Sequence, residues 1–174
     1  MQNRNSSSIS TADIPLFIAL QPINSELKPD EPCTLDIAVQ NTDGNNSVLT
    51  FLTWDTPLDP HAGVLGVFEI HDEDDPSVKI NTQIIAIRRK LPPPPEDFVE
   101  IAAQQTLSAR VMLDQVDLPA GRRYAIRAKG WWQAVWEATK EEVLADAEKA
   151  EQLSGGAMSG VFVSESVIVS VVRR

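Results

Sequence analysis

The sequence contains few of the residues that build metal and redox sites: it has one cysteine, Cys33, and two histidines, His61 and His71, in 174 residues. A single cysteine excludes an intramolecular disulfide framework and a zinc site made of several cysteines. The sequence also lacks an apolar run near the roughly 18 residues that a membrane-spanning helix needs. We therefore expect no disulfide, no metal cofactor and no membrane segment.

Positive charge is also scarce, because 15 lysines and arginines stand against 25 aspartates and glutamates and leave a net charge of −10. Proteins that bind nucleic acid or anionic lipid present clusters of lysine and arginine, so neither partner is expected. The N-terminal residues lack the charged and then apolar pattern of a signal peptide. This absence predicts a cytoplasmic or non-classically secreted protein.

What the sequence does contain is typical of one folded domain. Its length lies within the roughly 100–200 residues of a single domain. Apolar residues make up 43% of the chain, a fraction too high for a disordered protein. Residues 1–12 are polar and rich in serine, which predicts a flexible tail. Residues 13–174 are expected to form the domain.

Most of this domain consists of short runs in which apolar and polar residues alternate, the pattern of a half-buried β-strand. The clearest run contains Leu35, Ile37 and Val39 at every second position. Turns rich in proline, glycine, asparagine and aspartate separate the runs. The predicted strands are residues 14–20, 34–41, 48–54, 64–70, 78–80, 83–87, 98–102, 107–113, 123–128 and 160–172.

One segment has the character of a helix. Thr139 and Glu142 have the spacing of a capping box, and Gly155 marks the end of the alanine- and glutamate-rich run that follows, so we predict a helix over residues 139–153. Many short strands with one late helix indicate a mainly β protein, an immunoglobulin-like antiparallel β-sandwich. Tyr124 follows a Pro-Ala-Gly turn, as does the tyrosine that bonds back to upstream backbone in such domains.

Residues capable of catalysis or metal binding form no recognisable motif. Cys33 begins an alternating apolar run, which indicates a buried thiol rather than a nucleophile. No Gly-x-Ser-x-Gly motif is present, so we predict a non-enzymatic protein without a cofactor. The acidic run that contains Asp72, Asp74 and Asp75 is a weak candidate for calcium. A solvated acidic turn is the better interpretation of that run.

Tryptophans provide the first candidate surface for a partner. Trp131 and Trp132 are adjacent, so on a strand they point to opposite faces, and Trp136 follows shortly before the predicted helix. Core packing is the favoured role for these residues. The solvent-facing members of the three are candidate partner-binding residues, because an exposed tryptophan contributes strongly to binding interfaces.

A second candidate surface is the segment that combines a basic run with four prolines. Arg88 and Arg89 offer a local positive patch on an acidic protein. Residues 92–95 are all proline, which predicts an extended polyproline II segment on the surface. Pro93 and Pro94 therefore join the two arginines as candidate partner-binding residues.

Several of the apolar runs resemble the N-terminal propeptides of deuterolysin-type fungal zinc metalloendopeptidases. These runs are residues 35–42, 67–70, 87–91, 98–102, 107–113 and 164–172. The resemblance implies a free-standing propeptide-like domain that engages, inhibits or assists another protein, such as a metalloendopeptidase, and has no active site. The catalytic domain of that family, with its zinc-binding helix, has no counterpart in the sequence.

These observations predict a β-sandwich that binds another protein without catalysis, in the role of a protease inhibitor or chaperone module. The alternative is a carbohydrate- or small-ligand-binding, lectin-like module that uses the tryptophans, assisted by calcium at the acidic turn. An enzyme with an unrecognised site is the least favoured hypothesis. The oligomeric state stays open.

Overall fold

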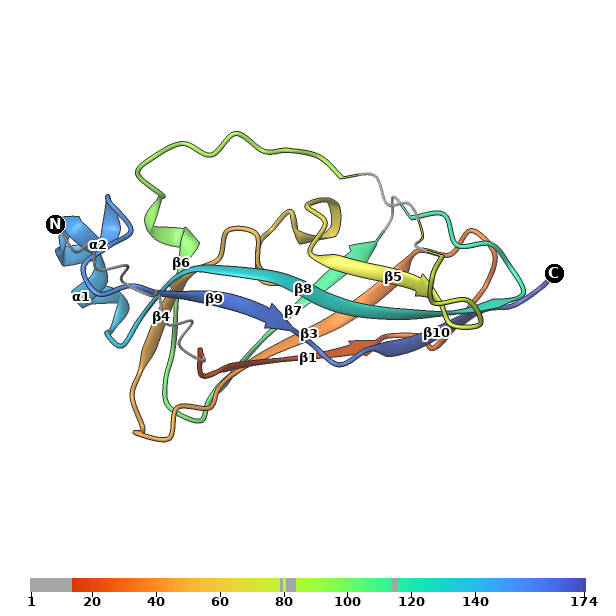
Figure 1. Cartoon of the computed structure of the whole chain (residues 1–174), viewed down its shortest axis with the longest axis horizontal. Helices are drawn as coiled ribbons and strands as arrows, with labels where there is room; N and C mark the ends of the chain where they lie inside the picture. The colour runs from red at the N-terminus through yellow and green to blue at the C-terminus, as the bar shows by residue number, and fades with distance from the viewer. Residues whose placement is uncertain (1–13, 79, 81–83, 114–115) are drawn as a thin grey trace, which may run out of the picture.

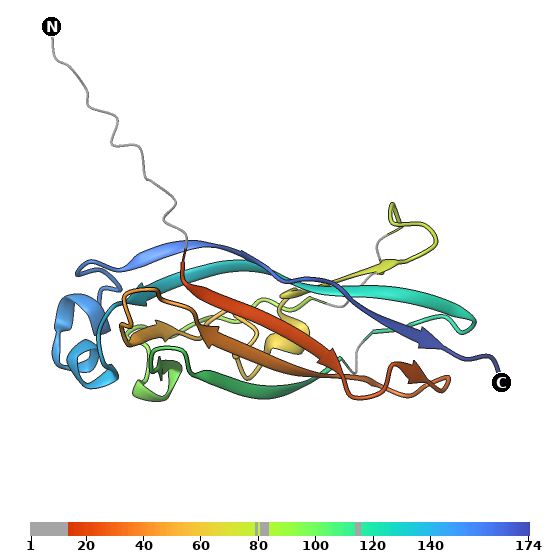
Figure 2. The same ribbon diagram turned by 90° about the horizontal axis from the view of Figure 1, so that it is seen from below.

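Two β-sheets pack face to face in the computed structural model, which describes residues 14–78, 80, 84–113 and 116–174. Seen from below, the sheets form two layers that enclose the core (Figure 2). The smaller sheet has the strand order β1–β3–β7. The larger sheet follows the path β2–β10–β8–β4–β6, with β5 and β9 also paired to β8. The predicted mainly β sandwich is confirmed.

The elements follow one another along the chain as Figure 1 labels them. The strands are β1 (Leu16–Pro22), β2 (Glu26–Leu27), β3 (Cys33–Asn41), β4 (Leu49–Leu52), β5 (Phe68–Asp72), β6 (Phe98–Ile101), β7 (Thr106–Leu113), β8 (Arg122–Trp136), β9 (Met158–Val163) and β10 (Val167–Val171). The α-helices are α1 (Lys140–Ala145) and α2 (Ala147–Ala150), and the 3-10 helices are η1 (Ala62–Val64) and η2 (Pro95–Asp97).

The smaller sheet forms as its alternating sequence predicts. In β3 every second side chain is buried and the residues between them are half-buried. The buried residues include Cys33, Leu35, Ile37 and Val39. β3 pairs in antiparallel fashion with β1 on one side and β7 on the other. Because side chains alternate between the faces of a strand, this register turns one apolar face toward the larger sheet. The strand predicted over residues 34–41 is confirmed.

β8 is the longest strand and organises the larger sheet. Its first half lies between β10 and β5, and its second half pairs with β9 and β4. The Tyr124 hydroxyl donates a hydrogen bond to the Pro119 carbonyl oxygen at 2.6 Å, which confirms the predicted tyrosine corner. β8 extends well beyond the predicted strand 123–128, because neighbouring strands supply partners along most of its length.

The main core lies between the two sheets and contains Trp132. The centroid of its ring lies 5.1 Å from that of Phe51 and 5.0 Å from that of Phe162. Aromatic pairs of this kind contribute about 0.5–1.5 kcal/mol beyond the burial of their area. Gly130 permits this packing, since a Cβ atom there would lie 2.7 Å from the Phe162 ring.

A second apolar cluster covers the opposite face at one end of the larger sheet. A bulge between Trp132 and Val135 shifts the register of β8, and a bulge exchanges the faces of the residues after it. Trp136 therefore leaves the main core and packs beneath α1, with its ring centroid 6.0 Å from that of Phe98. Its indole N–H donates to the Ser154 carbonyl oxygen at 2.8 Å.

The helix predicted over residues 139–153 begins where expected but does not continue to the predicted end. Thr139 and Glu142 form the expected capping box, and α1 then ends after six residues. Asp146 has an extended backbone, and its carboxylate caps α2 by accepting the Glu148 N–H at 3.0 Å. Two short helices therefore replace the single predicted one.

The strand predicted over residues 160–172 is also divided, into β9 and β10. At Ser164 the side-chain oxygen accepts the Ala128 N–H at 2.8 Å. A side chain thus takes the place of a backbone carbonyl, and the ladder between β8 and its neighbour is interrupted at this point.

The strands predicted over residues 78–80 and 83–87 need correction as well. Their described residues form no strand, and residues 79 and 81–83 lie outside the described part of the chain. The backbone of Val78 and Ile80 instead hydrogen-bonds to β5. The predicted tail, residues 1–12, also lies outside the described residues. No helix within the described ranges is long and apolar enough to cross a membrane.

Candidate functional site

β9 presents an open edge of the larger sheet. It runs alongside β8 (Figure 1), and on its other side it has no strand partner among the described residues. Val161 and Val163 are 67% and 56% exposed. Trp131, 44% exposed, lies on β8 directly opposite Val161 in the register. An edge strand therefore carries outward-facing apolar side chains beside an exposed tryptophan.

The backbone of β9 makes this edge available for hydrogen bonding. The Ser164 N–H donates to the Ala128 carbonyl oxygen at 2.9 Å, so its backbone points toward β8. Backbone groups alternate in direction along a strand. The N–H and C=O groups of Val161 and Val163 therefore point away from β8, toward the open side.

The chemistry of this edge differs from that of ordinary edge strands. Natural edge strands are usually blunted by lysine, proline or a covering loop. Residues 157–164 contain neither a charge nor a proline. By contrast, Val78 and Ile80 cover the edge of β5 with backbone hydrogen bonds. Among the residues that the structure describes, none gives β9 such protection against the addition of another strand.

One positive charge lies beside these apolar residues. Lys129 is exposed and pairs with Val163 in the register of β8 and β9. We call Lys129, Trp131, Val161 and Val163 the β9 edge surface. Of these four residues, the sequence pattern indicated only Trp131 as a partner-binding candidate. The missed signal was an alternating valine pair in a strand without charged residues.

The structure divides the predicted tryptophan surface. Trp131 is exposed, whereas Trp132 lies in the main core and Trp136 lies beneath α1. Trp54 is also buried, and its indole N–H donates to the Asp97 carboxylate at 2.7 Å. The predicted opposite orientation of Trp131 and Trp132 is confirmed. Trp132 and Trp136 are not accessible to a partner, so a platform of several stacked tryptophans is absent from the described surface.

Arg89 does not form the free positive patch that the sequence suggested. Its guanidinium group pairs with the buried carboxylate of Asp59, lies 3.4 Å from Asp55, and stacks 5.2 Å from the ring centroid of Trp54. A buried carboxylate requires such a partner. Arg89 therefore has a structural role, whereas Arg88 is exposed and stays a candidate for partner binding.

The proline run is only partly an exposed extended segment. Residues 84–94 form a long arc along one side of the molecule (Figure 1). Pro94 is exposed and extended, whereas Pro93 is buried and Pro95 begins η2. The Asp97 backbone carbonyl accepts the Thr53 N–H at 2.9 Å, which holds the end of the run against β4. Pro93 is thus removed from the candidate surface.

The Asp55 carboxylate connects the arc to Gln133 of β8. The Gln133 side chain, two residues from Trp131, donates to Asp55 at 2.7 Å. Asp55 also interacts with Arg89 of the arc. The two predicted partner surfaces therefore lie near each other, although most of their predicted residues have structural roles.

The acidic run is organised by internal hydrogen bonds. Asp72 is buried and pairs with Arg122, which lowers the pKa of the Asp72 carboxyl. Asp72 also accepts the Asp74 N–H, and Asp75 bonds to Ser77. Within the described ranges no group of three or more His, Cys, Asp or Glu residues is placed to hold a metal ion. The acidic turn is the interpretation that fits these contacts.

The thiol and the two imidazoles have different surroundings. Cys33 is buried, and burial raises its pKa to about 11, so the thiol is protonated at neutral pH. This confirms the predicted buried thiol. His61 is exposed, and His71 lies 3.5 Å from Glu69.

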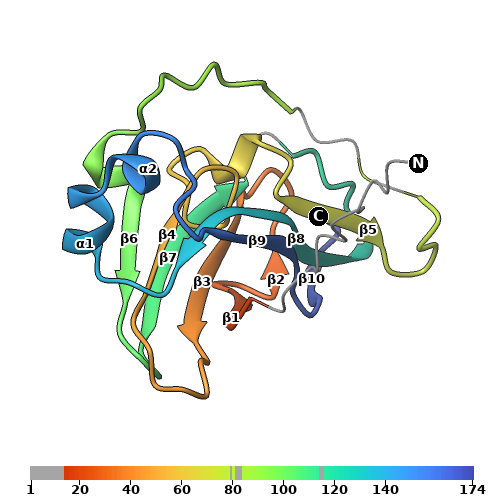
Figure 3. The ribbon, with the colours of Figure 1, turned by 60° about the vertical axis from the view of Figure 1, so that its left-hand side comes forward.

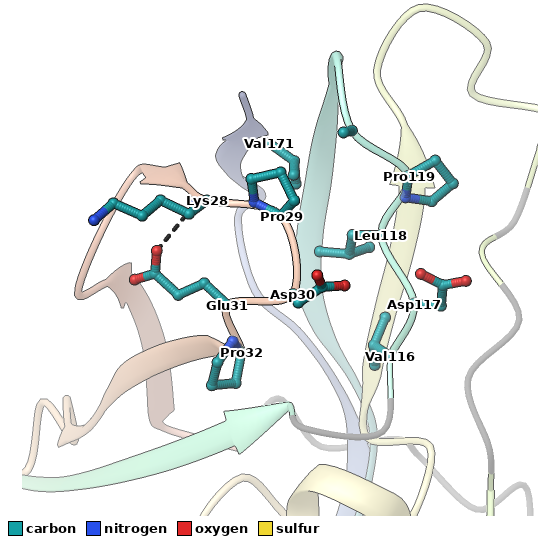
Figure 4. Close-up of a pocket in the computed structure, with 11 residues that line it drawn as sticks. Lys28, Pro29, Asp30, Glu31, Pro32, Val116, Asp117, Leu118, Pro119 and Val171 are labelled. Atoms are coloured by element: carbon teal, nitrogen blue, oxygen red, sulfur yellow. Dashed lines mark hydrogen bonds between the residues drawn. The ribbon is translucent and has the colours of Figure 1, made fainter. Parts of the chain in front are cut away.

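A hollow lies between residues 28–32 and residues 116–120 (Figure 4). Its volume is about 640 Å³ and it is open to solvent. Two of its carboxylates have partners: Glu31 accepts the Lys28 backbone N–H at 2.9 Å, and Asp30 pairs with Arg174 at 2.8 Å. Binding pockets combine an enclosing apolar wall with converging polar groups. Because this hollow is open and lacks an enclosing apolar wall, it is a weaker candidate than the β9 edge surface.

Two comparisons with known proteins bear on this chain. The sequence profile of the immunoglobulin-like domain matches residues 23–171. An uncharacterized secreted protein of Arthroderma benhamiae is 42% identical over 160 residues, which span 90% of this chain and 79% of that protein. The secreted relative overturns the predicted cytoplasmic location. Neither similarity bears on the deuterolysin propeptides, so that resemblance stays a prediction.

Proposed function

We propose that this chain, which belongs to the immunoglobulin-like domain family, is a secreted protein without enzymatic activity. We infer that it binds an extended segment of another protein along β9. The observation that carries the proposal is the open edge of β9 with Val161 and Val163 exposed beside Trp131. Secretion is supported by the description of the A. benhamiae relative as a secreted protein.

The mechanism is the addition of a strand to the larger sheet. An incoming extended segment hydrogen-bonds to the outward N–H and C=O groups of Val161 and Val163, and these bonds set its register. Apolar side chains of the segment then pack against the two valines. Trp131 lies behind them on the same face and covers the contact, as interface tryptophans commonly do.

Charge indicates that the occupant is a different protein rather than a second copy. Each chain has a net charge of −10, so two copies repel each other at long range. Residues 157–164 carry no charge, which suits an uncharged apolar strand. Lys129 at the border of the surface provides a positive charge for a carboxylate of the partner. We therefore expect a segment with alternating apolar residues and an acidic residue near one end.

A finer proposal concerns the class of partner. The resemblance to deuterolysin propeptides supports a metalloendopeptidase, which the domain would inhibit or assist by occupying its surface with the β9 edge. The carbohydrate-binding alternative would depend on Trp131 alone among the tryptophans, because Trp54, Trp132 and Trp136 are buried. A direct inhibition assay with a purified deuterolysin-type protease tests this finer proposal separately.

The general proposal is tested with a displayed library of random eight-residue peptides. Enriched peptides should show apolar residues at alternate positions. Val161→Pro removes an outward N–H without removing a bond to β8, because proline is tolerated at the open side of an edge strand. This variant should lose binding at least tenfold, while the matched control Leu91→Lys, which changes another exposed apolar residue, should bind normally.

Two outcomes would contradict the proposal. Binding of the enriched peptides to a folded Val161→Pro protein as tightly as to the original protein would place the binding site elsewhere. A dimer in analytical ultracentrifugation that Val161→Pro dissociates would make a second copy the occupant.

A further inference from the structure

The turn between β3 and β4 contains a sequence motif that the proposed binding function does not use. Asn45, Asn46 and Ser47 form an Asn-x-Ser sequon, the acceptor motif for N-linked glycans in secreted proteins. We propose that Asn45 carries an N-linked oligosaccharide. This inference rests on the secretion stated in the proposed function and not on the role of β9.

The side chain of Asn45 is available, in contrast to those of two other asparagines, Asn41 and Asn24. Asn41 is buried and its amide donates to the carbonyl oxygens of Ser47 and Ile101. The Asn24 amide donates to the Glu31 carboxylate at 3.0 Å. Asn45 is exposed, and no side-chain hydrogen bond of the described structure involves its amide. A sugar attached there breaks no native contact.

The surroundings of Asn45 leave room for a large substituent. Residues 44–46 are all exposed, and a Cβ atom placed on Gly44 meets no atom within 4 Å. Figure 3 shows this turn projecting from one end of the sandwich, beyond the ends of β3 and β4. Glycosylated sequons lie in exposed turns of this kind.

The turn is nevertheless well defined by its own hydrogen bonds. The Asp43 carboxylate accepts the Ser47 N–H at 3.0 Å, and the Asp43 carbonyl oxygen accepts the Asn46 N–H at 3.2 Å. Asn46 has a φ of 59°, a left-handed conformation that asparagine tolerates well. The acceptor is thus held on a rigid support outside the core, so the glycan has a fixed point of origin.

The chemistry is a group transfer to the chain before it folds. The Asn45 amide nitrogen attacks the anomeric carbon of an oligosaccharide carried on a lipid diphosphate. A bond forms between that carbon and Nδ2, the bond to the diphosphate oxygen breaks, the lipid diphosphate leaves, and the amide releases one proton. The folded protein then presents the glycan at the turn, away from the core.

The test is secretion of the full chain from a yeast host behind an added secretion leader. Endoglycosidase treatment should reduce the mass of the original protein. Peptide mass spectrometry should identify Asn45 as the residue to which the glycan is attached. The sequence has a second sequon at Asn5, outside the described residues. Asn5→Gln should therefore keep the Asn45 glycan, Asn45→Gln should lose it, and Ser47→Thr should retain it.

An unmodified Asn45 peptide in folded protein recovered from the medium would overturn the proposal. Because the added leader fixes the secretion route, this failure would concern the acceptor site alone. The peptide-binding assay on Asn45→Gln remains a separate measurement of the β9 edge surface. Binding by this variant should match that of the original protein, so the two proposals fail independently.

Discussion

Trp131 and Trp132 are neighbours in the sequence but belong to different environments. Trp132 is 1% exposed and contacts two aromatic rings of the main core, whereas Trp131 is 44% exposed beside an open strand edge. The inner face of the larger sheet therefore stabilises the fold. The outer face near β9 contributes little to stability and is available for binding. Substitutions on the two faces should separate these roles.

Trp132→Ala tests the inner face and should have the largest effect. Removing a buried tryptophan leaves a cavity and should reduce the free energy of unfolding by about 3–5 kcal/mol. Phe51 and Phe162 would lose their aromatic partner. Urea denaturation measures the change. A loss below about 1 kcal/mol would mean that Trp132 is not a central core residue.

Arg89→Ala tests a place where the outer side of the sheet is covered. The substitution leaves the buried Asp59 carboxylate without its cation, which should reduce the free energy of unfolding by about 2 kcal/mol. The matched control is the neighbouring exposed Arg88→Ala, which should change stability by less than about 0.5 kcal/mol. Equal effects of the two variants would contradict the structural role of Arg89.

Tyr124→Phe removes one hydrogen bond from the inner face and keeps the ring. Because the hydroxyl bonds to Pro119 at 2.6 Å, the free energy of unfolding should fall by about 1 kcal/mol. The change in the denaturation midpoint measures it. An unchanged midpoint would show that the tyrosine corner makes no net contribution.

Asp72 gives the inner face a dependence on pH. The hydrogen bond from Arg122 lowers the folded-state pKa of Asp72 below 3.8. On acidification, Asp72 therefore binds a proton in the unfolded chain before it does so in the folded chain. The contribution of Asp72 to the free energy of unfolding is present above pH 4 and is lost as the pH falls through the folded-state pKa. Thermal unfolding between pH 2 and 7 should show a smaller acid-induced loss for Asp72→Asn than for the original protein. Parallel curves for the two proteins would contradict this role.

Trp131→Ala should have the smallest effect on stability, within about 0.5 kcal/mol, because the side chain is largely solvated. The same variant should weaken binding of the enriched peptides at least tenfold. Denaturation and peptide binding, measured on one preparation, therefore separate the two neighbours. A stability loss as large as that of Trp132→Ala would remove the contrast between the faces.

Local patterns predicted several parts of this protein well. The alternation around Leu35 predicted β3, the Pro-Ala-Gly turn predicted the bond from Tyr124, and the spacing of Thr139 and Glu142 predicted the start of α1. Each of these features depends on residues close together in the chain. The length of the helix was predicted wrongly because the Asp146 side chain competes for the backbone of the next turn.

The candidate site was predicted less well, because its residues depend on distant neighbours. Arg89 and Pro93 look exposed in the sequence, but Arg89 is bound by Asp59 and Pro93 is buried in the folded chain. Trp136 changes face because of the bulge in β8. Val161 and Val163 became candidates only when β9 proved to have no covering strand in the described structure.

The strand alternation, the tyrosine corner, the helix cap and the lack of a recognisable catalytic motif follow from the order of nearby residues. Folding of distant segments against one another sets which tryptophan is exposed, which arginine is held in an ion pair and which strand edge is open. The reason is physical: a residue's side of a strand is a local property, but its burial depends on which distant segment packs against that side.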